Sequence, residues 1–266
     1  PKLQQVFQGL SEQTFPMDRT EVVVVDSGSR DGTAEFLSGS FPFECKYIRQ
    51  ADQGKTAARN RGIREAQAEL ILMTDADMIP HRDWVREHVE LNSCYEGRVM
   101  FQGKTWVMRE ESRPVEEHVR RPYITRSLRH RQKLGFYYCL TGNLAIPRRV
   151  FDQYGVFDED FRNYGWEDIE FGYRSIKKGG VPLIYNSKAQ NYHYHVWSQS
   201  RELDRRYQMG KSVHILLQKH PRLRYFAGIN PVNILIHRVL SHRPDTVEKW
   251  MQQIEDDGSL PWWPRQ

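Results

Sequence analysis

Four consecutive valines, at residues 22–25, are the feature of this sequence that most restricts its fold. β-Branched residues favour strands, and a strand without polar alternation is typical of one that is buried on both faces, as parallel strands are. This run leads into Asp26, and a second apolar run at residues 70–73 leads into Asp75 and Asp77. Helical patterns lie before and between the two runs, at residues 3–10, 34–37 and 54–68. This alternation predicts an α/β fold, with a mostly parallel, twisted sheet flanked by helices.

Composition limits the class of protein. With 266 residues, of which 39% are hydrophobic, the chain can bury a large core and is neither disordered nor collagen-like. A net charge of +5 is small for this size and does not indicate a nucleic-acid partner. The three cysteines lie far apart, at Cys45, Cys94 and Cys139, which disfavours a disulfide framework or a zinc knuckle and predicts a reducing, cytoplasmic compartment. No apolar run approaches the ~18–20 residues that span a bilayer, although a peripheral contact with the inner face of the membrane stays open.

Carboxylates follow both apolar runs. Ligands of parallel sheets bind beyond the carboxyl ends of the strands, where Asp26, Asp75 and Asp77 are expected. Asp75 and Asp77 are two residues apart, so their side chains can point the same way at the end of an extended segment. A divalent cation that also holds a diphosphate would relieve their repulsion. The alternative is an acidic turn that caps the next helix.

A third acidic cluster begins the predicted helix at residues 166–178. Asp168 shares a helix face with Gly172 and Ser175, which leaves room for a bulky ligand above the carboxylate. Glu167 and Asp168 lie in the first helical turn, where the helix dipole favours their ionised forms. An ionised carboxylate beside a cleft can act as a general base. The alternative is an acidic first turn that only stabilises the helix.

His193 and His195 are separated by one residue in a segment that is expected to be extended. They can therefore share one face, and imidazole is a common metal ligand. With Asp77, one of them could complete an oxygen and nitrogen ligand set for Mn²⁺. A strand that carries two half-buried histidines is the alternative.

Taken together, these motifs resemble a known family. The segments Val-Val-Val-Val-Asp-Ser-Gly-Ser-Arg-Asp-Gly-Thr, Gln-Gly-Lys-Thr-Ala-Ala-Arg-Asn-Arg-Gly and Thr-Asp-Ala-Asp, at residues 22–33, 53–62 and 74–77, are similar to family 2 glycosyltransferases of the GT-A fold. Residues 141–147 and 164–174 resemble the galactosyltransferase-type carboxyl-terminal segment of chondroitin-polymerase-like and β-1,4-galactosyltransferase-like enzymes. The resemblance extends over about residues 1–215.

The resemblance implies a role for each matching residue. Asp75 and Asp77 would form the DxD motif, with Asp77 as the more direct ligand of Mn²⁺ or Mg²⁺, and His193 or His195 would complete the metal shell. Asp168 would be the general base, and Glu167 would hold sugar or acceptor hydroxyls. The nucleotide and donor would be contacted by Asp26, Lys55, Arg59, Asp75, Asp77 and Trp166. His195-Val196-Trp197 resembles the metal site of polypeptide N-acetylgalactosaminyltransferases, which favours His195.

Three departures from the family pattern stand out. The usual first strand, which ends in a Pro-Thr-Tyr-Asn-like segment, is not found, and we expect it to be missing from this chain. The paired aspartates after the second strand are Asp26-Ser27 here, which leaves one carboxylate. The motif Tyr-Gly-Trp-Glu-Asp has one glycine fewer than Trp-Gly-Gly-Glu-Asp, so Trp166 directly precedes Glu167.

The resemblance also implies the domain plan. We expect a GT-A domain over residues 1–220, with a nucleotide-binding half at 1–103 and an acceptor half at 136–220. Between them, residues 104–135 carry nine Lys/Arg against four Glu and would form a basic excursion, either a lid over a diphosphate or a solvated surface. Residues 221–266 would be a helical extension with an aromatic tail.

The expected function is metal-dependent, inverting transfer of a sugar from a nucleoside-diphosphate sugar, with UDP as the favoured nucleotide. The acceptor would be a hydroxyl of a glycan or glycolipid. One alternative is a sugar-1-phosphate nucleotidyltransferase, although its glycine-rich loop near the amino terminus is not found. The other is a nucleotide-sugar-binding protein with a decayed site. Donor sugar, acceptor and oligomeric state are left open.

Overall fold

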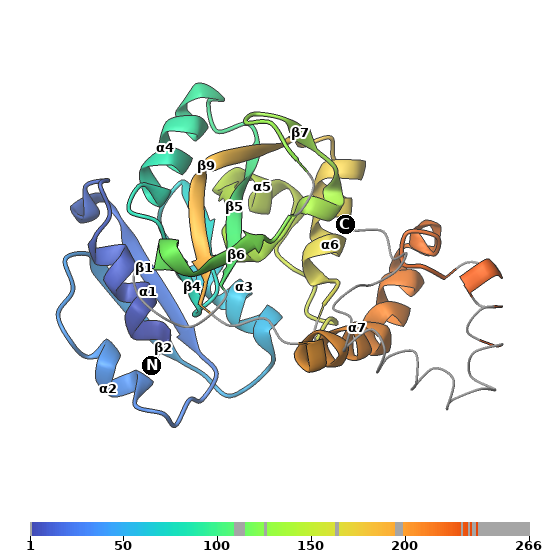
Figure 1. Cartoon of the computed structure of the whole chain (residues 1–266), viewed down its shortest axis with the longest axis horizontal. Coiled ribbons are helices and arrows are strands. Elements are labelled where there is room, and N and C mark those ends of the chain that lie inside the picture. Colours follow the sequence, from blue (N-terminus) through green and yellow to red (C-terminus); the bar gives the residue numbers. More distant parts are fainter. Residues whose placement is uncertain are drawn as a thin grey trace. The chain divides into compact units, whose positions relative to one another are not determined.

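The computed structural model describes residues 2–108, 115–124, 127–162, 165–194 and 199–229, with residues 231–233, 235 and 238 (Figure 1). The chain divides into two compact units, residues 1–212 and 213–266. In these described parts, no helix combines the length and hydropathy that crossing a membrane requires.

The larger unit contains two sheets. A parallel pair joins β1 (Glu21–Asp26) to β2 (Glu44–Arg49) over their full length. The second sheet has seven strands in the order β3-β8-β5-β9-β4, with β6 paired to β5 and β7 paired to β9. These strands are β3 (Leu70–Met73), β4 (Met78–Pro80), β5 (Met100–Met108), β6 (Val119–Pro122), β7 (Lys133–Leu134), β8 (Leu144–Pro147) and β9 (Leu183–His193).

The predicted α/β architecture is confirmed, but the large sheet is mixed rather than mostly parallel. β5 and β9 are parallel, whereas β3, β4, β6, β7 and β8 join by antiparallel pairs. A parallel neighbour needs a crossover of about a dozen residues or more, usually a helix. Within the described residues, β5 and its parallel partner β9 are separated by α5 and α6, whereas β6 follows its antiparallel partner β5 without an α-helix between them.

Seven α-helices are present among the described residues: α1 (Lys2–Ser11), α2 (Thr33–Leu37), α3 (Lys55–Glu65), α4 (Trp84–Cys94), α5 (Arg148–Tyr154), α6 (Glu167–Gly172) and α7 (Gln199–Lys219). Helix α1 follows the predicted spacing and buries Val6, Phe7 and Leu10. Helix α6 continues as a π-helical stretch, Tyr173–Lys178, which ends where the helix predicted at residues 166–178 ends, before Gly179. Short 3₁₀ turns occupy Met17–Arg19, Val115–His118, Phe136–Tyr138, Thr141–Asn143 and Pro221–Leu223.

An apolar cleft runs along one edge of β1 and one edge of β3. Among the described residues, β1 pairs only with β2 and β3 only with β8, so each strand keeps an edge without a strand partner. Both strands line the same cleft, which has a volume of about 1200 Å³. The valines of β1 are consequently half-buried, although the sequence predicts burial on both faces. The described residues place no strand in this gap.

Residues 104–135, predicted to form an excursion, begin inside the sheet. Lys104 and the next four residues complete β5, and the Lys104 ammonium lies 3.7 Å from the centre of the Trp106 ring. Strands β6 and β7 also come from this region and extend the sheet. These strands are not evident in the sequence because edge strands need little apolar surface and can therefore be polar.

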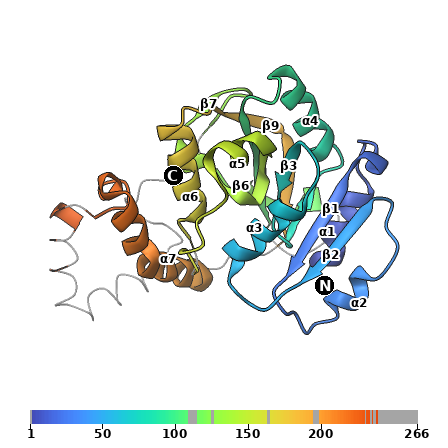
Figure 2. The ribbon, with the colours of Figure 1, turned by 180° about the vertical axis from the view of Figure 1, so that it is seen from behind.

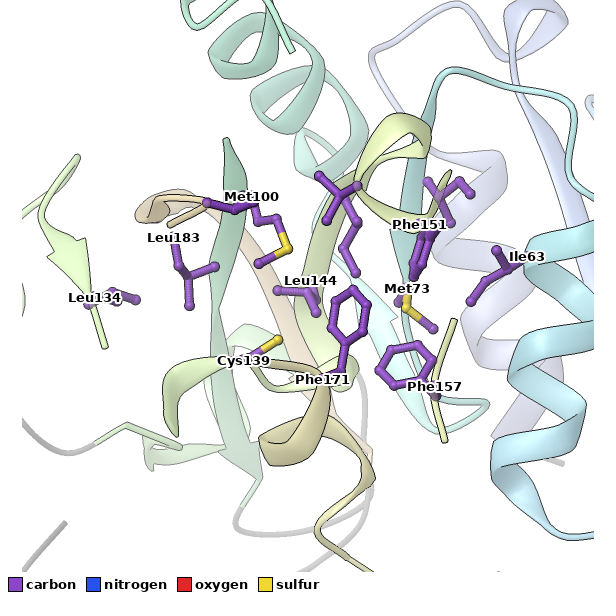
Figure 3. Close-up of a cluster of buried hydrophobic side chains, with 14 of the residues drawn as sticks. Ile63, Met73, Met100, Leu134, Cys139, Leu144, Phe151, Phe157, Phe171 and Leu183 are labelled. Atoms are coloured by element: carbon purple, nitrogen blue, oxygen red, sulfur yellow. The ribbon is translucent and has the colours of Figure 1, made fainter. Parts of the chain in front are cut away.

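An aromatic cluster holds α6 in a fixed position relative to the sheet. Figure 3 shows Phe171 of α6 beside Phe151 and Phe157, with ring centroids 5.4 and 4.8 Å away. The three rings belong to a larger core with side chains from five strands, including Met73, Met100, Leu134, Leu144 and Leu183. Because the Phe171 side chain is fully buried, the first turn of α6 has a fixed position relative to the sheet.

Glycine is needed at one position of α6 for close packing. A Cβ on Gly172 would lie 2.5 Å from the carbonyl oxygen of Phe136 and 2.7 Å from the Cβ of Cys139. Ser175 is fully buried and donates to the Phe171 carbonyl oxygen. The small residues therefore serve helix packing, and the expectation that they leave space for a ligand beside Asp168 is wrong.

Candidate active site

The cleft along β1 and β3 collects most of the predicted site residues. They come from the carboxyl ends of β1, β3 and β9 and from the first turns of α3 and α6. The residues of this set that line the cleft are Asp26, Lys55, Arg59, Asp75, Asp77, Glu167, Asp168 and His193. His195 lies outside the described residues.

Arg59 links the two acidic motifs. Its guanidinium Nη2 lies 3.0 Å from Asp75 Oδ1, and its Nη1 donates to Glu167 Oε1 at 2.6 Å. Lys55, one helical turn earlier on α3, places its Nζ 2.7 Å from the same Glu167 oxygen. Residues separated by about a hundred positions in the sequence thus meet in one charged cluster of two cations and two carboxylates.

Burial and charge shift the pKa values of Glu167 and Asp168 in opposite directions. Burial alone would raise the pKa of Glu167, but the cations of Lys55 and Arg59 lower it below its ordinary value. For Asp168, burial and then the negative charge of Glu167 raise the pKa to about 7. A partly exposed carboxyl group with this pKa can accept a proton near neutral pH, which is the property that a general base needs.

Only one of the two carboxylate oxygens of Glu167 contacts the cations of Lys55 and Arg59. Its side chain is 2% exposed, and Oε1 receives both cations. The other oxygen, Oε2, is buried and has no hydrogen-bond partner among the described residues. A buried carboxylate oxygen without a donor is costly, so a hydroxyl from a bound molecule would stabilise this site.

Asp77 and His193 form the candidate metal-binding pair. His193 Nε2 lies 3.3 Å from Asp77 Oδ2, because the antiparallel β4–β9 pairing sets Met78 opposite His193. The backbone amide of Tyr194 also donates to the Asp77 carbonyl oxygen at 2.7 Å. A carboxylate oxygen and an imidazole nitrogen suit Mn²⁺. No cluster of three or more His, Cys, Asp or Glu side chains suited to a metal occurs in the described ranges.

Asp26 is held at the end of β1 by local hydrogen bonds. Its Oδ1 accepts from the Ser29 amide at 2.8 Å, and its Oδ2 accepts from the Tyr47 hydroxyl at 2.8 Å. Burial raises the pKa of Asp26, but the hydrogen bonds from Ser29 and Tyr47 outweigh it and hold the pKa below its ordinary value. Asp26 is therefore a fixed, ionised acceptor at the rim of the cleft.

Trp166, directly before Glu167, does not line the cleft. Its indole Nε1 donates to the carbonyl oxygen of Met209 in α7 at 2.7 Å. Its backbone has a φ of 76°, in the left-handed region that costs a bulky residue of order 1–3 kcal/mol. Such strain is retained where the surroundings fix it, and here it sets the start of α6.

Sequence reasoning missed the polar residues that hold the turn Thr141–Asn143 against the carboxylates. Asn143 is fully buried: its Oδ1 faces Trp84 Nε1 at 2.8 Å and His88 Nε2 at 3.0 Å, and its Nδ2 donates to two backbone carbonyls. Gln102 Nε2 donates to the Asn143 carbonyl oxygen at 3.0 Å, and Asn191 Nδ2 donates to the Gly142 carbonyl oxygen at 2.7 Å.

This turn lies beside the DxD carboxylates. A Cβ on Gly142 would lie 3.6 Å from Asp75 Oδ2 and 3.0 Å from the Met78 methyl group. Asn143 also restricts β5, since a Cβ on Gly103 would lie 2.2 Å from its Oδ1. The segment at 141–147 contributes to the family resemblance, and a polar residue between apolar ones was the signal that could have identified Asn143.

The amino-terminal part of the chain, residues 1–155, matches the family model for glycosyl transferase family 2. A chondroitin synthase of Pasteurella multocida is 27% identical, over 82% of this chain and 26% of that protein. A validoxylamine A glucosyltransferase of Streptomyces hygroscopicus is 28% identical, over 80% of this chain and 57% of that protein. The chain thus spans between about a quarter and about three-fifths of the length of these relatives.

Two solved structures share the fold. TarS of Staphylococcus aureus matches with a TM-score of 0.57 and 16% identity, over 72% of this chain and 34% of that chain. The mannosyltransferase PcManGT from Pyrobaculum calidifontis, in complex with GDP-Man and Mn²⁺, matches with a TM-score of 0.51 and 21% identity, over 72% and 52%. At these identities the likeness concerns the fold.

Proposed function

The chain belongs to glycosyl transferase family 2, and we propose that it is a metal-dependent, inverting glycosyltransferase. It would move a sugar from a nucleoside-diphosphate sugar to a hydroxyl of a glycan or glycolipid. The observation that carries this proposal is the double contact of Arg59, which joins Asp75 of the DxD motif to Glu167 of the Glu-Asp pair. The donor and acceptor ends of the reaction are thereby within the span of one side chain.

The residues fit a divalent metal. Asp77 and His193 would bind Mn²⁺ or Mg²⁺, and Asp75 lies in the same cleft; His195 stays a predicted ligand. When bound, such an ion supplies a positive charge that stabilises the departing diphosphate. Asp26 would accept a hydrogen bond from the nucleotide base, and the cations of Lys55 and Arg59 would lie beside the nucleotide.

Asp168 would take the proton of the acceptor hydroxyl. The hydroxyl oxygen then bonds to the anomeric carbon, the bond from that carbon to the diphosphate oxygen breaks, and the nucleoside diphosphate leaves with the electron pair. A single displacement of this kind inverts the anomeric centre. The buried Oε2 of Glu167 would accept a hydrogen bond from a sugar or acceptor hydroxyl.

The relatives guide the choice of substrates. Two of them are named as a chondroitin synthase and a validoxylamine A glucosyltransferase, and related TarS structures hold UDP and UDP-GlcNAc. We therefore favour a UDP-sugar donor and a saccharide acceptor for this chain. The three cysteines carry no disulfide, and a cytoplasmic location stays part of the proposal.

A donor and acceptor panel with Mn²⁺ tests this function. UDP release that depends on the acceptor and stops on chelation is the expected result, with inversion read from the anomeric proton coupling of the product. Asp168→Asn should abolish release and retain the thermal shift produced by the donor. Asp152→Asn, on the exposed face of α5, is the matched control and should behave like the wild type.

The same panel addresses the two alternatives. A nucleotidyltransferase would form nucleotide-sugar and pyrophosphate from a sugar-1-phosphate and a nucleoside triphosphate. A protein with a decayed site would show a donor-induced thermal shift without turnover in the wild type. Normal turnover in Asp168→Asn would refute the assigned base even if the chain is a glycosyltransferase.

A further inference from the structure

Residues 213–243 concentrate positive charge. The sequence has five Lys/Arg and four His in this segment and no Asp or Glu. The formal net charge of the whole chain is also +5, so this segment alone carries a charge equal to that of the entire chain. No carboxylate within the segment can neutralise it. Such a segment attracts a polyanion or an anionic surface.

The same segment exposes apolar side chains. The described residues include seven exposed large hydrophobic side chains, and four of them lie here: Tyr225 is 63% exposed, Phe226 41%, Val232 65% and Leu235 62%. Scattered single apolar residues are ordinary on a surface, but this group falls within eleven consecutive positions. We call residues 222–235 the aromatic-basic turn, described at 222–229, 231–233 and 235.

The turn has a defined backbone. The amides of Ala227, Gly228 and Ile229 donate to carbonyls of the preceding turn at 2.8, 3.1 and 2.8 Å. Gly228 has a φ of 78°, and its carbonyl accepts from the Asn233 side chain at 2.8 Å. Leu223 is 5% exposed and anchors the loop that presents the exposed side chains of Tyr225 and Phe226.

We infer that the aromatic-basic turn docks this enzyme on an anionic lipid bilayer. Arg222 and Arg224 are exposed beside Tyr225 and Phe226, which matches charge to phosphate headgroups and apolar surface to the acyl boundary. Aromatic rings with a polar end favour the membrane interface. The inference does not depend on the proposed chemistry, because none of these residues lines the cleft.

Two other partners fit the surface less well. A second copy of the chain would bring two segments with the same excess of positive charge together in a symmetric contact, and these would repel. A nucleic acid would use the arginines and the aromatic rings, but Val232 and Leu235 offer it no stacking surface. Aliphatic side chains at 65% and 62% exposure are suited to hydrocarbon.

Vesicle co-sedimentation of the full chain tests the docking. We expect binding to phosphatidylcholine vesicles that contain phosphatidylglycerol, weak binding to pure phosphatidylcholine, and loss of binding as salt rises. The double variant Arg222→Gln, Arg224→Gln should weaken binding by about 30-fold, because each charge near the membrane surface contributes a factor of about five. Phe226→Ser should weaken it at all salt concentrations.

Matched controls separate this effect from net charge and from folding. Arg64→Gln with Arg98→Gln removes the same charge from two exposed arginines of the other unit and should leave binding within twofold of wild type. Tyr137→Ser, at 42% exposure, is the control for Phe226. The inference would be overturned by an equal loss of binding in the test and control pairs, or by equal binding to neutral and anionic vesicles. It would also be overturned if the Arg222 and Arg224 changes abolished dimerisation or nucleic-acid binding while vesicle binding persisted.

Discussion

Replacing Asp168 with asparagine should abolish transfer and make the protein more stable at neutral pH. The hydrogen bond that Asp168 Oδ1 accepts from the Ile169 amide, at 2.8 Å, is retained by an asparagine oxygen. What is lost is a carboxyl group whose pKa the fold raises to about 7 from 3.8. This difference of about three pKa units corresponds to about 4 kcal/mol as an upper limit. Solvent screening at a partly exposed side chain reduces the expected stabilisation to about 1–3 kcal/mol.

The size of this stabilisation depends on pH. Between pH 4 and pH 7 the unfolded chain has released the Asp168 proton while the folded chain retains it. Folded-state stability from this group therefore falls as the pH rises from 4 to 7 and is constant above that range. The stability gain of Asp168→Asn should be close to zero at pH 4 and reach its full value at about pH 7.5.

Urea unfolding of metal-free wild type, Asp168→Asn and Asp152→Asn at pH 4.5, 6 and 7.5 measures this difference directly. Asp152 is exposed, and its asparagine variant should follow the wild type at each pH. UDP release in the same preparations gives the activity. A variant no more stable than wild type at pH 7.5, or a gain that does not vary with pH, would refute the electrostatic account of Asp168.

Four further changes test other parts of the site. Glu167→Gln removes the negative charge that helps to raise the pKa of Asp168, so the acidic limb of the pH–activity profile should move to lower pH. Asn143→Ala leaves buried donors and acceptors without partners, which should cost about 3–5 kcal/mol in urea unfolding. Gly172→Ala should destabilise the protein by about 1–3 kcal/mol because its methyl group meets backbone. His193→Ala should remove most of the thermal stabilisation by Mn²⁺, whereas His81→Ala, outside the cleft, should not.

The parts of the site at strand ends could be predicted from the sequence. Asp26 and Asp75 follow apolar runs, and the carboxyl ends of the strands β1 and β3 lead both into one cleft. The spacing of Asp77 and His193 did not predict their contact, which comes from the β4–β9 register. A three-residue strand such as β4 has too short a pattern to be identified from the sequence.

Long-range polar contacts were beyond prediction for a different reason. The joint contact of Lys55 and Arg59 with Glu167 depends on how α3 and α6 pack, which no local pattern records. Asn143 acts through partners on α4, β5 and β9, and a single buried asparagine resembles an ordinary turn residue in the sequence. The half-buried valines of β1 likewise depend on which strands are present beside them.

The edges of β1 and β3 that have no strand partner among the described residues bear on how this chain behaves at high concentration. Valine-rich edges that offer unpaired amides and carbonyls are templates for strands of other molecules, and proteins normally blunt them with charge or proline. Among residues 21–26 the charged side chains stand only at the two ends, Glu21 and Asp26. The four valines between them form a short, uncharged, β-prone stretch with charges only at its flanks, so intermolecular strand pairing at this edge is the expected route to aggregation.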